Sequence, residues 1–246
     1  MPRMSADDVH TTLAALEAAG TAQNRKVYQR HGVTPPLFGV SYAILGKLSK
    51  KIGVDHALAL GLWESGVHDA RVLACMIADS SKATMKLLES WVKPIDNYVL
   101  SDALSSFAAR APQAGKLGGK WRKSKKEFVA ATGWNVLAGA ALHAEDFDEA
   151  AAEELIATIE ATIHSAPNRT RHSMNQALIA VGVRNARLHE LAVAAAKRIG
   201  EVQVDHGQTS CKTPDAVDYM AKTLAHRKAH PPKAKARAKS KSARKT

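Results

Sequence analysis

The stretch that organises the chain reads WVKPIDNYVLSD, from Trp91 to Asp102. It holds a proline turn, a helix start, an aromatic residue and, one helical turn later, an acid. Tyr98 and Asp102 are four residues apart, so on a helix they share one face and can act on one ligand. The alternative is an ordinary helix N-terminus, where the positive end of the dipole favours acids.

The composition of the 246-residue chain favours helices over strands. It is 46% hydrophobic with many alanines and leucines, only 5% aromatic, and poor in runs of β-branched residues. No apolar run reaches membrane-spanning length, and the first residues lack the apolar core of a signal peptide. Cys75 and Cys211 lie far apart, and the histidines show no metal-ligand spacing. We therefore expect a soluble, cytoplasmic protein with no metal and no cofactor.

Helical periodicity runs through almost the whole chain. No segment shows the period-2 alternation of a strand bounded by hairpin turns. The expected helices cover residues 5–19, 21–32, 38–53, 55–66, 68–79, 81–92, 95–110, 124–144, 147–164, 168–184, 187–200 and 214–228. Helices of this length joined by short loops, Pro112 to Gly119 among them, predict an all-α, HEAT-like solenoid of helix pairs. Such solenoids usually bind their partners on the concave face.

The C-terminal segment carries most of the positive charge. Residues 227–246 contain nine Lys or Arg and no acid, which leaves about +3 of the net charge of +12 on the rest of the chain. Because these residues have nothing to bury, we expect a solenoid domain over 1–226 and a disordered basic tail over 227–246. Nucleic acid is the expected partner of the tail, and a merely solubilising tail is the alternative.

Two groups of basic residues are candidates for contacts with DNA phosphates. The stretch from Lys116 to Lys126 includes Lys120, Arg122 and Lys123, and it has the composition of a phosphate-contacting loop or of a solvated linker. Arg169 and Arg171 follow Asn168, which is expected to cap the start of a helix. There, backbone amides and guanidinium groups can meet a phosphate together.

Other positions have competing structural interpretations. Arg71 either meets a phosphate in the groove or pairs with an acid, while His68 and Asp69 cap the helix. The tryptophans Trp63, Trp91 and Trp134 lie on apolar helix stripes, which favours core positions over stacking platforms. Cys75 is expected in the core. Thr213 and Pro214 are expected to begin the last helix as N-cap and first helical residue.

Several motifs, in one order and spacing from Lys26 to Tyr219, carry a resemblance to a known family. They are RHGV at 30–33, FGVS at 38–41, LGKL at 45–48, DHALALGLW at 55–63, HDARVLA at 68–74, MIAD at 76–79, the stretch 91–102, EFV at 127–129, MNQAL at 174–178 and VGVRN at 181–185. In these motifs the chain resembles the DNA alkylation repair family, the AlkD-like DNA glycosylases built of HEAT-like repeats.

The resemblance implies a solenoid whose basic groove holds double-stranded DNA and an excision of N3- or N7-alkylated purines without a metal. It places the family's catalytic aspartate on Asp102, which closes the pattern of Trp91, Tyr98 and Asp102. In the family's chemistry, a carboxylate stabilises the oxocarbenium-like state of N-glycosidic cleavage. Tyr98 falls on the first site tryptophan and keeps an aromatic face for a cationic lesion. Gln176 falls on the second site tryptophan, and Ala131 on the DNA-gripping arginine, so those two groups are absent.

Two functional hypotheses follow. The first is a DNA-alkylation-repair-type DNA-binding protein that acts as a glycosylase through Asp102, with Tyr98 and Gln176 at the substrate. The second is a non-catalytic HEAT-repeat scaffold for duplex or distorted DNA. A solenoid that binds other proteins and carries a basic tail is a third hypothesis, with less support from the sequence. We expect a monomer, nucleoid-associated if bacterial. The expected DNA-binding residues are Arg30, Arg71, Lys120, Arg122, Lys123, Arg169, Arg171 and Arg184.

Overall fold

A computed structural model describes residues 6–143 and 148–230. Within those ranges the regular structure is entirely helical and contains no strand. The α-helices are α1 (Ala6–Ala19), α2 (Ala22–Arg30), α3 (Tyr42–Ile52), α4 (His56–Glu64), α5 (His68–Ile77), α6 (Met85–Val92), α7 (Tyr98–Ala108), α8 (Ala114–Trp121), α9 (Glu127–His143), α10 (Glu149–Thr162), α11 (Asn168–Gly182), α12 (Ala186–Ile199) and α13 (Ala216–Ala229).

The helix starts follow from the capping chemistry of the sequence. A side-chain oxygen accepts a hydrogen bond from a first-turn amide at most starts, and the residues that provide it are Thr21, Ser41, Asp55, Thr84, Asn97, Asp148, Asn185 and Asp215. At the other end, α3 and α12 stop at Gly53 and Gly200, whose positive φ values of 74° and 71° suit glycine. Local sequence therefore fixes where most of the helices begin and where these two end.

The structure corrects three expected boundaries. Residues 114–121, expected to lie in a connection, form α8, because Leu117 and Trp121 are buried against the core. The third helix begins at Tyr42 rather than Phe38, since the amides of residues 38–40 are bonded to Asp69. The last helix is capped by Asp215 rather than Thr213.

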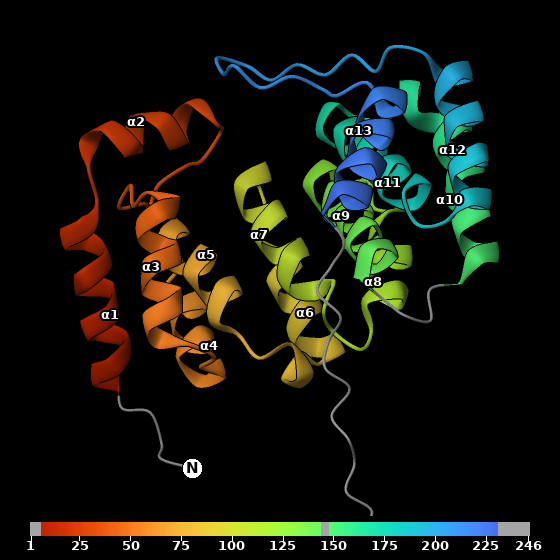
Figure 1. Cartoon of the computed structure of the whole chain (residues 1–246). Helices are drawn as coiled ribbons and strands as arrows, with labels where there is room; N and C mark the ends of the chain where they lie inside the picture. Colours follow the sequence, from red (N-terminus) through yellow and green to blue (C-terminus); the bar gives the residue numbers. More distant parts are fainter. Residues whose placement is uncertain (1–5, 144–147, 231–246) are drawn as a thin grey trace, which may run out of the picture.

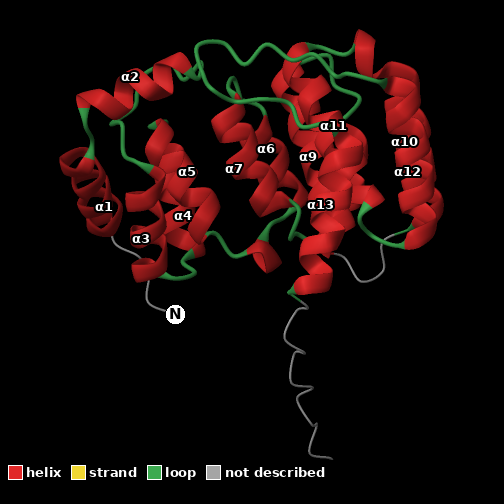
Figure 2. Cartoon of the chain, turned by 45° about the horizontal axis from the view of Figure 1, so that its top comes forward, coloured by secondary structure: helices red, strands yellow, loops and turns green. Residues whose placement is uncertain are grey.

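The helices stack in pairs to form a curved solenoid (Figures 1 and 2). The odd-numbered helices from α3 to α13 pack side by side in one continuous row. The even-numbered helices α4, α6 and α8 each pack against the odd-numbered helix that follows, and α10 and α12 cover α11. Side chains on α7, α9 and α11 therefore come together although they are far apart in sequence.

Helix α9 joins the two halves of the core. Val129, Val136 and Ala140 pack with the helices from α1 to α8, whereas Trp134 and Leu137 pack with α10 to α13. The helix is mostly apolar, and most of its residues from Val129 to Ala141 are buried. The expected core positions of Trp63, Trp91, Trp134 and Cys75 are confirmed, since each is at most 5% exposed.

The C-terminal segment is described only at its start. Helix α13 continues through Ala229, so the first residues of the expected tail are helical, and Arg227 Nη1 donates to the carbonyl of Val183 at 2.6 Å. The remainder of that segment, 231–246, lies outside the described residues.

Candidate nucleic-acid site

Helix α7 presents Tyr98 and Asp102 on one face, as their spacing predicts. Asn97 caps the helix by accepting from the amide of Leu100 at 3.0 Å. On the buried side, the hydroxyls of Ser101 and Thr132 lie 2.9 Å apart and tie α7 to α9. The exposed face therefore has a fixed orientation, with Tyr98 at its first residue and Asp102 one turn later.

Asp102 lies between two hollows. One, of about 380 Å³, is formed with α2 and α3, and the other, of about 520 Å³, with α9 and α11. Asn135 Nδ2 donates to Asp102 Oδ1 at 2.9 Å. The carboxyl group reaches water yet is crowded by protein atoms, and this desolvation raises its pKa to about 6, against the opposing effects of Arg169 and Asn135.

Arg169 crosses from α11 to the aromatic residue of α7. Its guanidinium carbon lies 4.0 Å from the centroid of the Tyr98 ring, close enough for a strong cation–π contact. The Tyr98 hydroxyl is hydrogen-bonded to His31 Nδ1 at the end of α2. The aromatic face predicted to receive a cationic base therefore already holds a cation.

The two hollows have different linings. Tyr42 at the start of α3 lines the smaller hollow with Tyr98 and is 45% exposed. Gln176 and His172, one turn apart on α11, line the larger one. Gln176 is thus brought to Asp102 as predicted, while Tyr42 and His172 were missed because no local pattern connects α3 or α11 with α7.

A long connection spans the upper edge of the site. Residues 200–215, here called the strap, leave α12, run toward α2 and return to α13 (Figures 1 and 2). Near its tip, Gly207 lies close to the backbone of Arg30. A Cβ atom added at Gly207 would be 4.0 Å from the carbonyl oxygen of Arg30. The strap therefore brings the two ends of the solenoid together above α7.

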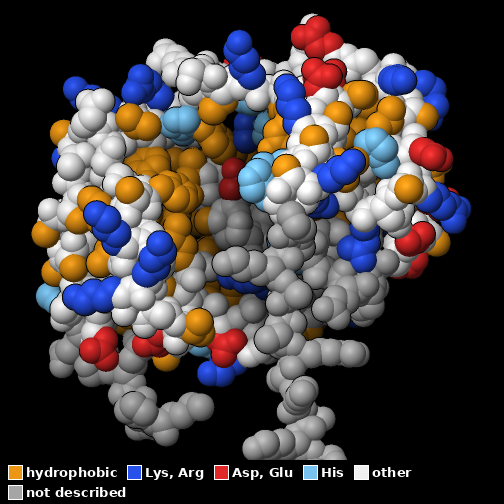
Figure 3. All heavy atoms as spheres, in the orientation of Figure 1, with side chains coloured by type: hydrophobic (Ala, Val, Ile, Leu, Met, Phe, Trp, Pro, Cys, Tyr) orange, Lys and Arg blue, Asp and Glu red, His pale blue; other side chains and the backbone are white. Residues whose placement is uncertain are grey.

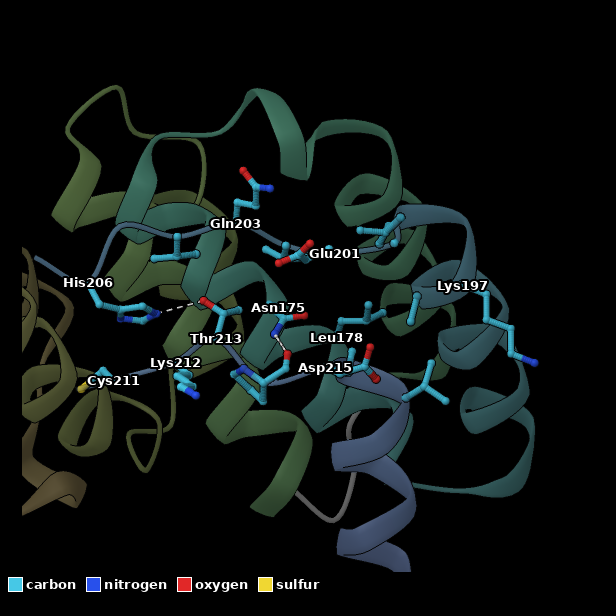
Figure 4. A pocket seen from close by; sticks show the side chains of 18 residues that line it. Asn175, Leu178, Lys197, Glu201, Gln203, His206, Cys211, Lys212, Thr213 and Asp215 are labelled. Atoms are coloured by element: carbon cyan, nitrogen blue, oxygen red, sulfur yellow. Dashed lines mark hydrogen bonds between the residues drawn. The ribbon is translucent and has the colours of Figure 1, made fainter. Parts of the chain in front are cut away.

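Hydrogen bonds hold the strap to the first residue of α11. The side chain of Asn168 pairs with the backbone of Asp205, donating and accepting at 2.7 Å each. Asn168 was expected to cap α11, but it serves this tertiary contact instead. Across the strap, His206 Nε2 and the Thr213 hydroxyl lie 3.0 Å apart (Figure 4), beside a hollow of about 660 Å³.

Several of the arginines expected to bind DNA make internal contacts. Arg71 Nε donates to the carbonyl of Trp63, and its guanidinium lies over the Trp63 ring. Arg171 donates to the carbonyls of Gln203 and Ala166, and Arg184 to that of Ala141. These three side chains hold elements of the solenoid together.

Two basic residues around α8 also make contacts within the protein. Arg122 is only 11% exposed, is paired with Glu154 at 2.9 Å and lies over the Trp134 ring. Lys120 pairs with Glu89 at 3.0 Å but remains 63% exposed. Lys123 and Arg30 are exposed, so they stay candidates for DNA contacts.

Ala131 is 2% exposed on α9. Figure 3 shows a hollow at the centre of the face in which acidic, basic and histidine side chains meet. Among the described residues, no group of three His, Cys, Asp or Glu is arranged to hold a metal ion. In the same part of the chain, every helix is too short or too polar to span a bilayer.

Replacing Asp102 by asparagine is expected to stabilise the fold at pH 8. The folded-state pKa of about 6 exceeds the ordinary 3.8, so the stability that the protonated carboxyl contributes is present at low pH and lost as pH rises through 6. Because solvent access to the carboxyl group weakens this effect, the expected gain in the free energy of unfolding is about 1 kcal/mol, or roughly 2–4 °C in Tm.

Thermal unfolding followed by circular dichroism at pH 8 and pH 5 measures this difference. The gain from Asp102→Asn should shrink at pH 5. The matched control is Asp218→Asn, an exposed acid in the first turn of α13 that should show no such pH-dependent gain. A destabilised Asp102→Asn protein at pH 8 would contradict the interpretation of Asp102 as a desolvated carboxyl group.

Comparisons with known proteins agree with this architecture. Residues 12–220 match the family described as DNA alkylation repair enzyme. The uncharacterized proteins Lin0241 of Listeria innocua and Lmo0209 of Listeria monocytogenes are 32% and 31% identical over 222 residues, which cover 88% of this chain and 96% of each relative.

A solved structure is similar in fold and in sequence. It belongs to a new family of proteins related to the HEAT-like repeat DNA glycosylases with affinity for branched DNA structures. It superposes with a TM-score of 0.79 at 28% identity, covering 89% of this chain and 94% of that one. The predicted HEAT-like solenoid is therefore confirmed, and the chain belongs to the DNA alkylation repair enzyme family.

Proposed function

We propose that this protein binds DNA at branch points or distortions and holds it in the groove over α7, α9 and α11 without excising a base. The affinity of the solved relative's family for branched DNA supports the ligand class. The observation that carries the proposal is the contact between Arg169 and Tyr98, because the aromatic face suited to a cationic alkylpurine is occupied by the protein's own cation.

The surrounding residues support binding over excision. Gln176 offers no second aromatic face, and the residue at 131 is a buried alanine. A cation–π wall contributes roughly 0.5–2 kcal/mol to lesion binding. Exposed Arg30 and Lys123 and the basic segment after residue 226 supply charges for phosphates at any sequence.

A glycosylase is the second candidate, favoured by one observation. Asp102 reaches both hollows, is oriented by Asn135 and is mostly ionised above its pKa of about 6, as a carboxylate that stabilises an oxocarbenium-like state must be. In that function Arg169 would have to leave the ring of Tyr98 before a cationic base could enter.

Two measurements on the full chain separate these functions. Fluorescence anisotropy at fixed salt is expected to show binding to a three-way DNA junction about tenfold tighter than to a linear duplex of equal length, a difference of about 1.4 kcal/mol. Release of base from N7-methylguanine-containing DNA is expected to be no greater than for Asp102→Asn. Equal affinity for junction and duplex would remove the preference for branched DNA, and release that Asp102→Asn abolishes would establish the glycosylase.

A further inference from the structure

Three histidines surround the guanidinium group of Arg169. His31 at the end of α2 bonds to Tyr98, the ring that Arg169 covers. His172 follows Arg169 by three residues on α11, so both side chains lie on the same face of that helix. His206 on the strap contacts His172 edge to face, with ring centroids 5.4 Å apart. We call these four residues the Arg169 cluster.

Each of the three histidines lies within electrostatic reach of Arg169, and His172 also lies within reach of His206. Burial together with the charge of Arg169 lowers the pKa of His31 and of His206, and lowers that of His172 to about 4. The imidazoles are therefore neutral at pH 7 in the DNA-free protein. The three elements that carry them, α2, α11 and the strap, meet only in the folded solenoid.

The cluster contains buried hydrogen-bonding groups that have no partner in the protein. Arg169 Nε and His172 Nδ1 are both buried and unbonded. The guanidinium group of Arg169 donates no hydrogen bond to any residue that the structure describes, and its contact is with the Tyr98 ring. Buried polar groups usually find partners, so a site with an unpaired guanidinium donor fits an external acceptor.

Three acids lie near the cluster, and they are partly engaged. Asp205, next to His206, accepts from the amide of Gly207 at 2.7 Å. Glu127 accepts from the backbone amide of Arg169 at 2.6 Å. Asp102 is bonded to Asn135 and has a raised pKa, so an arriving anion would favour its protonated form. Arg30, at the end of α2, adds a second full positive charge beside His31.

We propose that the Arg169 cluster binds one phosphate group of DNA, with the guanidinium group of Arg169 and the imidazoles of His172 and His206 as hydrogen-bond donors and the strap as one wall of the site. Arginine matches phosphate oxygens in bidentate geometry, and each imidazole can donate one hydrogen bond. This proposal rests on the proposed function for the source of the phosphate. It identifies where a branched DNA would be held closest to α7.

The phosphate that binds to the Arg169 cluster could be an internal phosphodiester of the DNA or a phosphate at a DNA end. An internal phosphodiester carries one charge, whereas a terminal 5′-phosphate carries nearly two at neutral pH. Three-way junctions with 5′-phosphate and with 5′-hydroxyl ends distinguish them. A preference for the phosphorylated ends identifies a terminal phosphate, and equal affinities identify a phosphodiester at the branch.

The test compares Arg169→Gln with Arg198→Gln in the full chain. Arg198 is an exposed arginine paired with Glu160 on the α10–α12 side, so its replacement removes the same charge away from the cluster. By fluorescence anisotropy, Arg169→Gln is expected to bind the three-way junction about tenfold more weakly and to lower the salt slope by about 1. Arg198→Gln should change neither. Circular dichroism melts verify that both variants fold.

A second measurement does not depend on DNA. Inorganic phosphate, added against chloride at equal ionic strength, is expected to shift the imidazole NMR signals of His172 and His206 in the wild-type protein and not in Arg169→Gln. Unshifted signals, with equal junction affinities for the two variants, would overturn the phosphate site while leaving the proposed function intact. Shifted signals in a protein that fails to bind junctions would instead overturn the proposed function and retain the site.

Discussion

Replacing Asp69 by alanine is expected to lower the free energy of unfolding by about 3–5 kcal/mol. The side chain is fully buried, and both oxygens accept backbone hydrogen bonds. Oδ2 accepts from the amides of Phe38 and Gly39 at 2.7 and 3.3 Å, and Oδ1 from that of Val40 at 2.7 Å. Alanine would leave three amides without an acceptor, two of them deep in the protein.

The consequence reaches the site because residues 38–40 connect α2 with α3. Helix α2 ends at Arg30, His31 follows it, and α3 begins with Tyr42. Loosening this connection would therefore also disturb the ring of Tyr98. Hydrogen exchange at the amides of residues 38–40 is expected to accelerate in Asp69→Ala. DNA binding should weaken as well, although Asp69 is fully buried and cannot contact DNA itself.

Urea unfolding of the wild-type protein and the variant measures this loss. The urea concentration at the midpoint should fall, while the dependence of the unfolding free energy on urea concentration stays constant. The matched control is Asp55→Ala. That aspartate also accepts a backbone hydrogen bond, but only one, from the amide of Leu58 at 2.9 Å at the start of α4. Its loss should cost about 1 kcal/mol. Equal losses for the two variants would contradict the role of Asp69 as the acceptor that holds residues 38–40.

Replacing Trp91 by alanine is expected to cost about 3–5 kcal/mol for a different reason. Trp91 is 2% exposed, and its ring lies parallel to that of Trp63, with centroids 4.2 Å apart and an interplanar angle of 4°. The ring of Phe107 also contacts Trp91, with ring centroids 5.5 Å apart. The three rings join α4, α6 and α7, so alanine would leave a cavity at the centre of the N-terminal half.

Chemical unfolding again measures this loss, and near-ultraviolet circular dichroism reports the stacked rings. Trp91→Phe should lose much less, because it retains most of the buried ring area. Tyr219→Ala, at an aromatic residue that is 49% exposed, should change stability by no more than about 0.5 kcal/mol. A loss for Trp91→Ala as small as that for Tyr219→Ala would show that the ring stack contributes little to stability.

The sequence by itself determined the helical class, most helix starts, the buried tryptophans and the shared face of Tyr98 and Asp102. These features depend on interactions within about one helical turn or on hydrophobic periodicity, and both can be read from residues that are close together in the sequence. The missed helix α8 shows the limit of this reasoning. Its glycines disfavour a helix and are typical of a loop. Burial of Leu117 and Trp121 outweighs this low helix propensity.

Only the tertiary structure decided what each arginine does. Arg71, Arg171 and Arg184 donate to backbone carbonyls, and a carbonyl acceptor has no signature in the sequence because every residue carries one. Arg169 reaches the ring of Tyr98 only because α7, α9 and α11 are neighbours in one row of the solenoid. The sequence therefore supplies the aromatic residue and the acid, and helix packing supplies the cation that covers the aromatic ring.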